Sequence, residues 1–410
     1  MNQTFAPDHV SQMPQPKIHE GWLLFVLAAI QFTHVMDFVI MMPLGPQLMR
    51  YFTIGPREFG FLVSAYTFSA AISGFISAFF IDRFGRKQAM LVLYVGFLLG
   101  TLACALAPTF GLLLLARVVA GLFGGVLGAL ILAVIGDVIP EERRGTATGK
   151  VMAAFSFASI AGIPLGLYLA SVFSWHAPFF LLTGLSVLVL LLIARFLPTM
   201  NDHLNKKVRT RPVEIYWAIF SKPNLLWALL LMVVLSFAGY TIIPFISPYM
   251  VANIGFSEVE LSYIYFFGGL ASLITSPLAG KLADMYGKKR VFVIGSLLSL
   301  IPIILITQLQ PSPHYIVLLI TTFFFISFGA RYVPAMSLIT SSVEPQQRGS
   351  FMSVNSAIQQ LASGAAAFIA GFIVQKGVTG QLEHFDTAGY VAAVSTIISM
   401  LIVVRLRKVS

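Results

Sequence analysis

Apolar residues run along this chain of 410 residues in twelve long blocks separated by short polar segments. An α-helix needs about 20 apolar residues to cross a hydrocarbon layer of about 30 Å, and the blocks are of that order. The expected fold class is therefore an all-α polytopic membrane protein with twelve transmembrane helices. The predicted spans are residues 22–48, 59–81, 88–107, 110–139, 146–173, 177–197, 225–251, 259–282, 291–309, 315–343, 349–374 and 388–405.

The two halves of the chain repeat each other. A charged hairpin between the second and third spans has a near copy between the eighth and ninth, with Asp82 and Gly85 matched by Asp284 and Gly287. The other matched pairs are Pro43 with Pro244, Pro46 with Pro248, and Arg144-Gly145 with Arg348-Gly349. A parallel repeat of this kind predicts two pseudo-symmetric six-helix bundles with a substrate site between them, near the middle of the membrane.

The composition of the loops predicts the domain boundaries. We expect a disordered tail at 1–20, which is polar and contains three prolines, a first bundle at 21–197 and a second bundle at 223–405. The longest polar connection, 198–222, is the predicted linker and has room for a short surface helix near 213–220. Residues 406–410 form the predicted C-terminal tail.

Charge is scarce and unevenly placed. Only 10% of the residues are charged and 58% are hydrophobic, whereas soluble domains carry about 25% charged residues. The net charge of +10 comes from basic residues in alternate short loops. This pattern predicts a plasma (inner) membrane protein with both termini in the cytoplasm, and it argues against a nucleic-acid partner.

Residues typical of enzymes and metal sites are missing from the sequence. Cys104 is the single cysteine, so an intramolecular disulfide is impossible. We find no metal-ligand cluster and no nucleophile motif. The sequence thus predicts neither an enzyme, a metal site nor a cofactor, and we expect a monomer in the lipid bilayer.

Among Asp, Glu, Lys, Arg and His, four residues fall inside predicted spans more than a few residues from either end: His34, Asp37, Arg117 and Arg331. Charge is costly there and usually functional. Asp37 and Arg117 lie at similar predicted depths, roughly 16 and 11 Å from the same end of their helices at 1.5 Å per residue, so they are expected to pair. His34 shares a helix face with Asp37. The set is either a proton-coupling site or a structural ion pair that holds helices together.

The predicted substrate cavity takes its residues from both halves. Polar side chains avoid lipid, and aromatic residues commonly line binding cavities. Arg331 has two interpretations, since it can bind an anionic substrate or neutralise a cluster of carbonyl groups. The cavity candidates are Met41, Tyr66, Tyr240, Phe267, Arg331, Asn355 and Gln359.

The charged hairpins resemble the signature loop of the major facilitator superfamily, Gly-x-x-x-Asp-Arg-x-Gly-Arg-Lys. The first copy matches at Asp82, Arg83, Gly85, Arg86 and Lys87, with Ala78 in place of the leading glycine. The second copy keeps Gly280, Asp284, Gly287, Lys288 and Lys289. The resemblance covers the whole membrane-spanning length and implies the twelve-helix fold of that superfamily.

Two further motifs indicate a branch of the superfamily. Arg117 to Gly121 resembles the Arg-x-x-Gln-Gly motif of proton-coupled members, with Ala120 where the glutamine stands. Gly162 to Gly166 resembles a degraded form of the Gly-Pro motif of drug/proton antiporters. The chain is most similar to the bacterial drug and sugar efflux carriers.

The repeated hairpin predicts a cytoplasmic gate. A carboxylate is favoured at a helix N-terminus, so Asp82 is expected at the start of the eleventh span and Asp284 at the start of the fifth. Gly85 and Gly287 are expected to have positive φ. The alternative is that the basic residues serve topology alone. The predicted gate consists of Asp82, Arg83, Gly85, Arg86, Lys87, Arg144, Asp284, Gly287, Lys288 and Arg348.

The function expected from these features is proton-coupled antiport that exports a small organic compound by alternating access. Asp37 would alternate between a protonated and a substrate-engaged state, and Arg117 would modulate it. A symporter or uniporter for a nutrient is the nearest alternative, since such carriers also hold charges inside the membrane. A non-transporting receptor is a more distant one, because it has no need for two matched hairpins.

Overall fold

The computed structural model describes residues 20–77, 79–200, 212–344 and 347–407. Nearly all of the expected N-terminal tail, most of the polar linker and residues 408–410 therefore lie outside the described residues. Ala78 and the side chain of Asp82 lie outside them as well.

Helices make up nearly all of the described chain. When each broken helix is counted as one span, twelve spans in the described chain are long and apolar enough to cross a membrane. This confirms the expected fold class. The elements are α1 (Glu20–Ile40), α2 (Gly45–Tyr51), α3 (Pro56–Ser77), η1 (Ile81–Arg83), α4 (Arg86–Leu106), α5 (Phe110–Val138), α6 (Glu141–Phe157), η2 (Ala158–Gly162), α7 (Ile163–Val172), α8 (Ala177–Phe196), α9 (Pro212–Phe220), α10 (Pro223–Tyr240), α11 (Ile243–Tyr249), η4 (Met250–Ile254), α12 (Leu261–Tyr286), α13 (Lys288–Thr307), α14 (His314–Ser341), α15 (Arg348–Ile373), β1 (Gln375–Lys376), β2 (Leu382–Glu383) and α16 (Phe385–Arg405).

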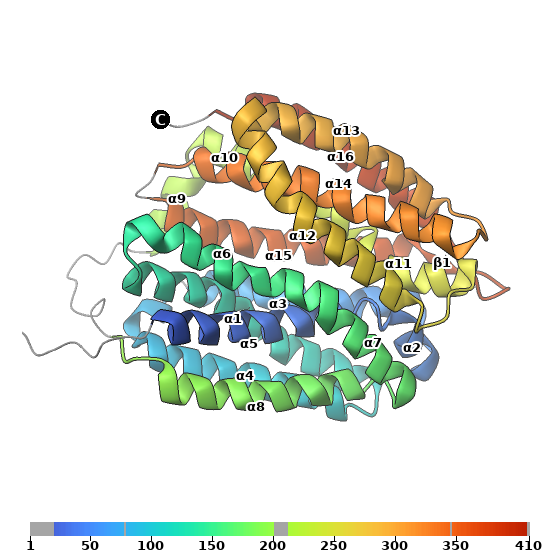
Figure 1. Ribbon diagram of the computed structural model, residues 1–410, viewed down its shortest axis with the longest axis horizontal. Coiled ribbons are helices and arrows are strands. Elements are labelled where there is room, and N and C mark those ends of the chain that lie inside the picture. Colours follow the sequence, from blue (N-terminus) through green and yellow to red (C-terminus); the bar gives the residue numbers. More distant parts are fainter. Residues whose placement is uncertain (1–19, 78, 201–211, 345–346, 408–410) are drawn as a thin grey trace, which may run out of the picture.

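The helices gather into two bundles that lie side by side (Figure 1). The bundle from α1 to α8 is blue to green in that view, and the bundle from α10 to α16 is yellow to red. We call the end that holds Glu20, Arg405 and the two charged hairpins the terminal end. The end that holds α2, α11 and the small β1–β2 hairpin is the opposite end.

The first helix of each bundle is broken at equivalent positions. α1 stops at Ile40 and α2 resumes at Gly45, while α10 stops at Tyr240 and α11 resumes at Ile243. Proline causes both breaks, because it lacks an amide hydrogen and its ring collides with the preceding turn. Pro43 and Pro244 lie at matching places in the two repeats.

The bundles touch closely along α3 and α15, which run antiparallel. A Cβ at Gly60 would lie 2.9 Å from the carbonyl oxygen of Ala367, and one at Gly74 would lie 3.4 Å from the Cβ of Ala357. Phe61 and Phe368 stack across the same seam, with ring centroids 5.1 Å apart. Small residues thus let the two backbones approach, as is usual between membrane helices.

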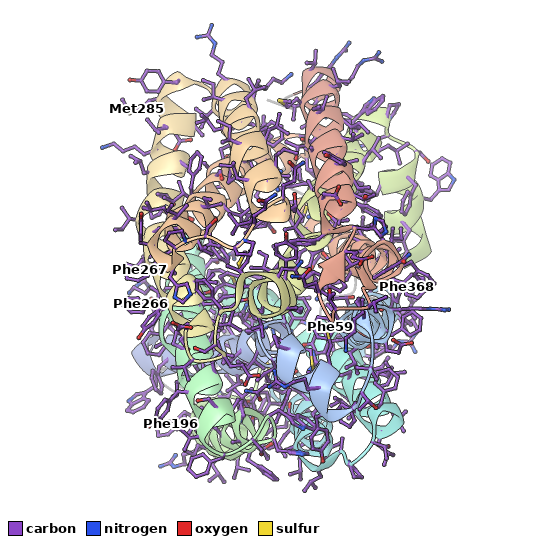
Figure 2. All side chains as sticks on the ribbon, turned by 90° about the vertical axis from the view of Figure 1, so that its right-hand side faces the viewer. Phe59, Phe196, Phe266, Phe267, Met285 and Phe368 are labelled. Carbon is purple, nitrogen blue, oxygen red and sulfur yellow. The ribbon has the colours of Figure 1, made fainter. Side chains whose placement is uncertain are left out.

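Large apolar side chains cover the outside of both bundles (Figure 2). Phe196 and Met285 are 38% and 62% exposed and lie at the edge of the molecule in that view, whereas Phe59 is fully buried between the bundles. An apolar exterior around a polar-containing interior is what a lipid environment requires.

Candidate functional site

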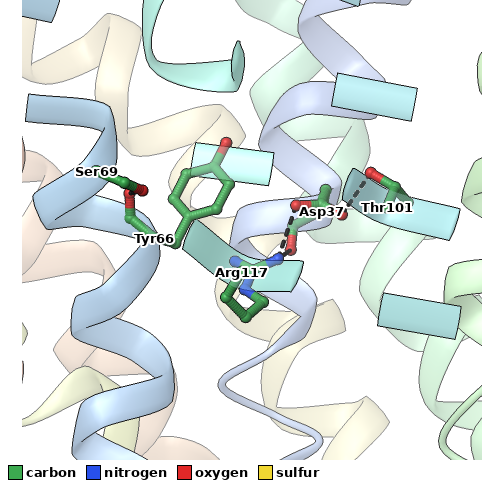
Figure 3. A network of polar contacts seen from close by, with 5 residues as sticks. All are labelled: Asp37, Tyr66, Ser69, Thr101 and Arg117. Atoms are coloured by element: carbon green, nitrogen blue, oxygen red, sulfur yellow. Dashed lines mark hydrogen bonds and ion pairs between the residues drawn. The ribbon is translucent and has the colours of Figure 1, made fainter. Parts of the chain in front are cut away.

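An ion pair forms the centre of the first bundle (Figure 3). The Nη1 atom of Arg117 lies 2.8 Å from Oδ2 of Asp37, and both side chains are almost completely buried. The hydroxyl of Thr101 donates to the other carboxylate oxygen at 3.0 Å. Three helices, α1, α4 and α5, therefore meet at one carboxylate, and the structure brings Asp37 and Arg117 together as the sequence predicts.

Arg117 has two more partners in the same place. Its Nη1 also donates to the main-chain oxygen of Asp37 at 3.3 Å, next to the break that ends α1. Its guanidinium carbon lies 4.4 Å from the ring centroid of Tyr66, a cation–π distance. Close packing of α5 on α3 produces this arrangement, because a Cβ at Gly121 would come within 2.3 Å of the Tyr66 carbonyl oxygen.

His34 lies one helical turn from Asp37 but is not bonded to it among the described residues. Both ring nitrogens are buried and have no hydrogen-bond partner there. The imidazole packs instead between Tyr66 and Phe97, at centroid distances of 6.5 and 6.2 Å. Buried polar atoms normally have partners, so His34 is an exception among the described residues.

Aromatic rings connect this centre to the second bundle. Phe38 stacks on Tyr66 with centroids 5.3 Å apart and approaches Tyr240 of α10 at 6.2 Å. These residues come from α1, α3 and α10 and lie where the two bundles meet.

Other predicted cavity residues have more varied surroundings. Gln359 donates to the Tyr332 hydroxyl at 2.9 Å, and Asn355 is buried with an Oδ1 that has no partner among the described residues. Met41 is 1% exposed and belongs to the apolar core. Phe267 is 43% exposed and lies beside Phe266 at the edge of the molecule in Figure 2, so the prediction that it lines the central cavity is not supported.

The basic residues of the hairpins close helix ends in their own bundle. Lys87 donates to the carbonyl oxygen of Ala194 near the end of α8, and Lys289 donates to Val404 at the end of α16. Arg144 donates to the carbonyl oxygens of Gly136 and Ile139 at the end of α5.

Two of the remaining basic residues, Arg348 and Lys288, also donate to main-chain oxygens in their own bundle. Arg348 donates to Val343, just past the end of α14, at 3.4 Å, and Lys288 donates to Ser337 of α14. Arg86 pairs with Asp137 of α5 at 2.8 Å. Arg83 is exposed. Cations are favoured at helix C-termini, so these residues stabilise each bundle internally.

Of the two carboxylates predicted at the gate, the structure describes the side chain of Asp284. The side chain of Asp82 lies outside the described residues. Asp284 is exposed and makes no hydrogen bond or ion pair among the described residues. The fifth span begins at Glu141, so Gly145 falls inside its first turn or two rather than at its start.

The two hairpin glycines differ from each other. Gly287 has φ +94°, as expected for a turn that only glycine enters easily. Gly85 has φ −59° and ψ 139°, so the expectation of positive φ there is wrong. The short η1 turn at Ile81–Arg83 reverses the chain before Gly85 and removes the need for a left-handed residue.

A contact between the bundles at the opposite end was not expected from the sequence. Glu258, in the loop before α12, accepts hydrogen bonds from Gln47 and Arg50 of α2. The Glu258 side chain is only 18% exposed, and Arg50 carries the compensating charge. The sequence shows the two residues of this ion pair, a basic residue after span one and an acidic residue before span eight. Nothing in the sequence indicates that these two loops lie next to each other.

Comparisons with known proteins agree with this architecture. The family model described as Major Facilitator Superfamily matches residues 27–244 and 228–410. The chain is 26% identical over 381 residues to the uncharacterized MFS-type transporter YceJ of Bacillus subtilis, covering 92% of this chain and 94% of that one. It is 24% identical over 242 residues to a probable sugar efflux transporter of Helicobacter pylori, covering 59% of this chain and 61% of that one.

Solved structures show the same fold. A D-xylose-proton symporter superposes with a TM-score of 0.79 at 17% identity, covering 93% of this chain and 97% of that one. A bacterial homologue of the lysosomal transporter Spinster, in an inward-facing and unoccupied conformation, superposes with a TM-score of 0.71 at 17% identity, covering 96% of each chain. With its twelve spans, its repeated hairpins and a family model that matches both halves, the chain belongs to the major facilitator superfamily and is a multi-pass membrane transporter of small molecules.

Proposed function

We propose that this transporter is a proton-coupled antiporter that exports a small organic compound. The observation that carries the proposal is the Asp37 carboxylate, buried at the break of α1 and held by Arg117 and Thr101. Protonation would remove the charge that binds Arg117. The guanidinium would then be free to change partners, which alters the packing of α1, α4 and α5 together.

Coupling to transport follows from where the pair lies. The main-chain oxygen of Asp37 is itself a partner of Arg117, so protonation acts on the end of a half-helix as well as on a side chain. Phe38, the next residue, contacts Tyr66 and Tyr240, and through Tyr240 the second bundle. A change at Asp37 thus reaches the interface about which the bundles rock.

Export is the direction we infer, in keeping with the similarity to a probable sugar efflux transporter. We further propose that the terminal end faces the cytoplasm, as the distribution of basic residues indicates. In a Cys104→Ser background, Ser312→Cys should react with a membrane-impermeant thiol reagent applied to intact cells, and Thr210→Cys should not. Labelling of Thr210→Cys from outside would reverse the orientation.

The test of coupling uses purified protein in liposomes that contain a pH-sensitive dye. Sugars and lipophilic drugs are added outside, and the sign of the dye response is recorded. Antiport makes the lumen more alkaline as solute enters, whereas symport makes it more acidic. Asp37→Asn should abolish the response while thermal stabilisation by the same compound persists. Asp386→Asn, a change at a half-buried carboxylate in the first turn of α16, is the matched control, and a parent-like response of Asp37→Asn would refute the proposal.

A further inference from the structure

Arg331 is a buried cation in the second bundle whose described partners are all neutral. It lies on α14 and is 1% exposed. Its Nη1 donates to the Thr396 hydroxyl of α16 at 2.7 Å, and its Nη2 donates to the carbonyl oxygen of Ala238 of α10 at 3.1 Å. A charge without a counter-charge is costly in a membrane interior. The carbonyl group of Ala238, which Arg331 contacts, therefore helps to stabilise the guanidinium.

Ala238 lies at the break of the seventh span. In an unbroken α-helix the amide of residue 242 would donate to the carbonyl of residue 238. Here the amide of Ile242 donates to Gly239 instead, at 3.0 Å, because α10 ends at Tyr240. Arg331 supplies the donor to Ala238, and its charge meets the negative end of the α10 dipole.

The same device occurs at the matching place in the first bundle. Aligning Pro43 with Pro244 puts Asp37 opposite Ala238. The main-chain oxygens of both residues accept from a buried arginine, Arg117 at 3.3 Å in one bundle and Arg331 at 3.1 Å in the other. The two arginines are not themselves matched, since Arg117 lies near the start of α5 and Arg331 near the middle of α14.

A proline inside α14 lies close to Arg331. Pro334 lies inside the helix and has no amide hydrogen to offer Ala330. α13 packs tightly at this point, where a Cβ at Gly295 would come within 2.8 Å of the Ala330 carbonyl oxygen. Arg331 therefore connects the part of α14 next to Pro334 to the broken end of α10.

We propose that Arg331 is a positioning residue that holds the break of the seventh span in place, as a fixed counterpart of the Asp37–Arg117 pair. The two halves differ in one respect. The first has a carboxylate that can take up a proton, whereas the second has alanine at that position and an arginine that keeps its charge at every physiological pH. The contact at the break after α1, the hinge of the first bundle, then changes with protonation. The contact at the break after α10, the hinge of the second bundle, stays the same at every physiological pH.

The pH statement depends on what surrounds each arginine. Asp37 is surrounded by Arg117, Thr101, Tyr66 and the nearby His34. The described contacts of Arg331 are Thr396, Ala238 and the ring of Phe328, whose centroid is 5.6 Å from the guanidinium carbon. None of these three titrates. The asymmetry rests on the proposed coupling role of Asp37, while the positioning role of Arg331 does not.

The experiment measures amide hydrogen exchange of the segment 237–245 in the full-length protein reconstituted in nanodiscs. Arg331→Gln should accelerate exchange there roughly tenfold, in line with the loss of one charge-assisted hydrogen bond. Arg331→Lys should give an intermediate rate. Thr396→Val, which removes the other partner, is the matched control and should behave as the parent does. Parent-like exchange in Arg331→Gln, or equal acceleration in Thr396→Val, would overturn the positioning role.

A second readout separates this inference from the proposed coupling. In a Cys104→Ala background, spin labels at Gln88→Cys and Arg290→Cys report the separation of the bundles at the terminal end. Arg331→Gln should shift these distances by the same amount at pH 5.5 and pH 8, and a pH-dependent shift would contradict a constant hinge. If the spin-label distances of the parent protein do not respond to pH, the proposed proton coupling at Asp37 is refuted. The hydrogen-exchange result then decides on the positioning role of Arg331 alone. If Arg331→Gln fails to insert into the membrane, the same measurements are made on Arg331→Lys and compared with those on Thr396→Val.

Discussion

At the scale of single residues, the decisive feature is a carboxylate that has no access to solvent and yet has a complete set of partners. Asp37 receives Arg117 on one oxygen and Thr101 on the other. Such a pair contributes little net stability compared with an apolar replacement, but removing one partner leaves a buried charge. This penalty is the physical reason why, in the coupling we propose, a change at Asp37 must be accompanied by a change at Arg117.

Arg117→Gln should therefore destabilise the folded protein by roughly 3–5 kcal/mol. The double variant Asp37→Asn/Arg117→Gln should be more stable than Arg117→Gln alone, because no unpaired charge remains. Thr101→Val, which removes one hydrogen bond, should cost about 1 kcal/mol. Thermal unfolding in detergent at pH 7.5 ranks the three variants, and a double variant less stable than Arg117→Gln would show that the pair acts through packing rather than charge.

At the scale of elements, the ends of the helices are closed by side chains that can be identified one by one. Arg144 and Arg348 close the ends of α5 and α14, and Lys87 and Lys289 close those of α8 and α16. In the turn that leads into α12, the side chains of Ser257 and Glu260 bond to each other and to each other's amides. This reciprocal arrangement is a capping box, and it lies directly beside Glu258.

The capping box has a pH signature. Hydrogen bonds from the Ser257 amide and hydroxyl lower the pKa of Glu260 below its usual value, with a smaller contribution from His314. A lowered pKa in the folded state means that the stabilisation is complete above the unfolded pKa of about 4.3 and is lost as pH falls through the folded value.

The melting temperature of the parent should accordingly fall more steeply below about pH 4.3 than that of Glu260→Gln, whose cap does not titrate. Melting curves between pH 3 and pH 7 check this, with Glu383→Gln, at an exposed carboxylate of the same end, as the control. Parallel curves for the parent and Glu260→Gln would show that the box does not contribute to stability.

At the scale of the whole molecule, the described part of the chain contains an ion pair between the bundles, and this pair lies at the opposite end. Glu258 binds Gln47 and Arg50 across the interface, and the aromatic contact of Phe59 with Phe245 lies deeper on the same side. Lys87 and Lys289 of the hairpins at the terminal end, by contrast, bind within their own bundles. In this conformation the contacts of Glu258 hold the two bundles together at the opposite end.

Glu258→Gln should shift the population towards conformers that are open at the opposite end, because the charge holding Arg50 is removed. Spin labels at Ser174→Cys and Val378→Cys in a Cys104→Ala background report the separation there, and longer distances are expected. Arg50→Gln should act in the same direction, and Glu383→Gln should not. Unchanged distances in both Glu258→Gln and Arg50→Gln would exclude this contact as a determinant of the equilibrium.

Much of this protein follows from the sequence alone. Twelve apolar blocks of spanning length require helices, because a backbone in hydrocarbon must satisfy its own hydrogen bonds. The repeated prolines and hairpins identify two related bundles. Asp37 and Arg117 were predictable as a pair because two isolated charges in a membrane need each other, and their depths can be counted along the helices.

The tertiary structure alone decided the contacts that depend on rotation of helices and on meetings between distant loops. Rotation places Phe267 on the outer surface, and Arg331 reaches a carbonyl that the break of α10 leaves without its usual donor. The approach of α2 to the loop before α12 pairs Arg50 with Glu258, more than two hundred residues apart. Hydropathy measures how much of a helix avoids water but not which neighbour each face meets, since lipid and protein interior are equally apolar to it.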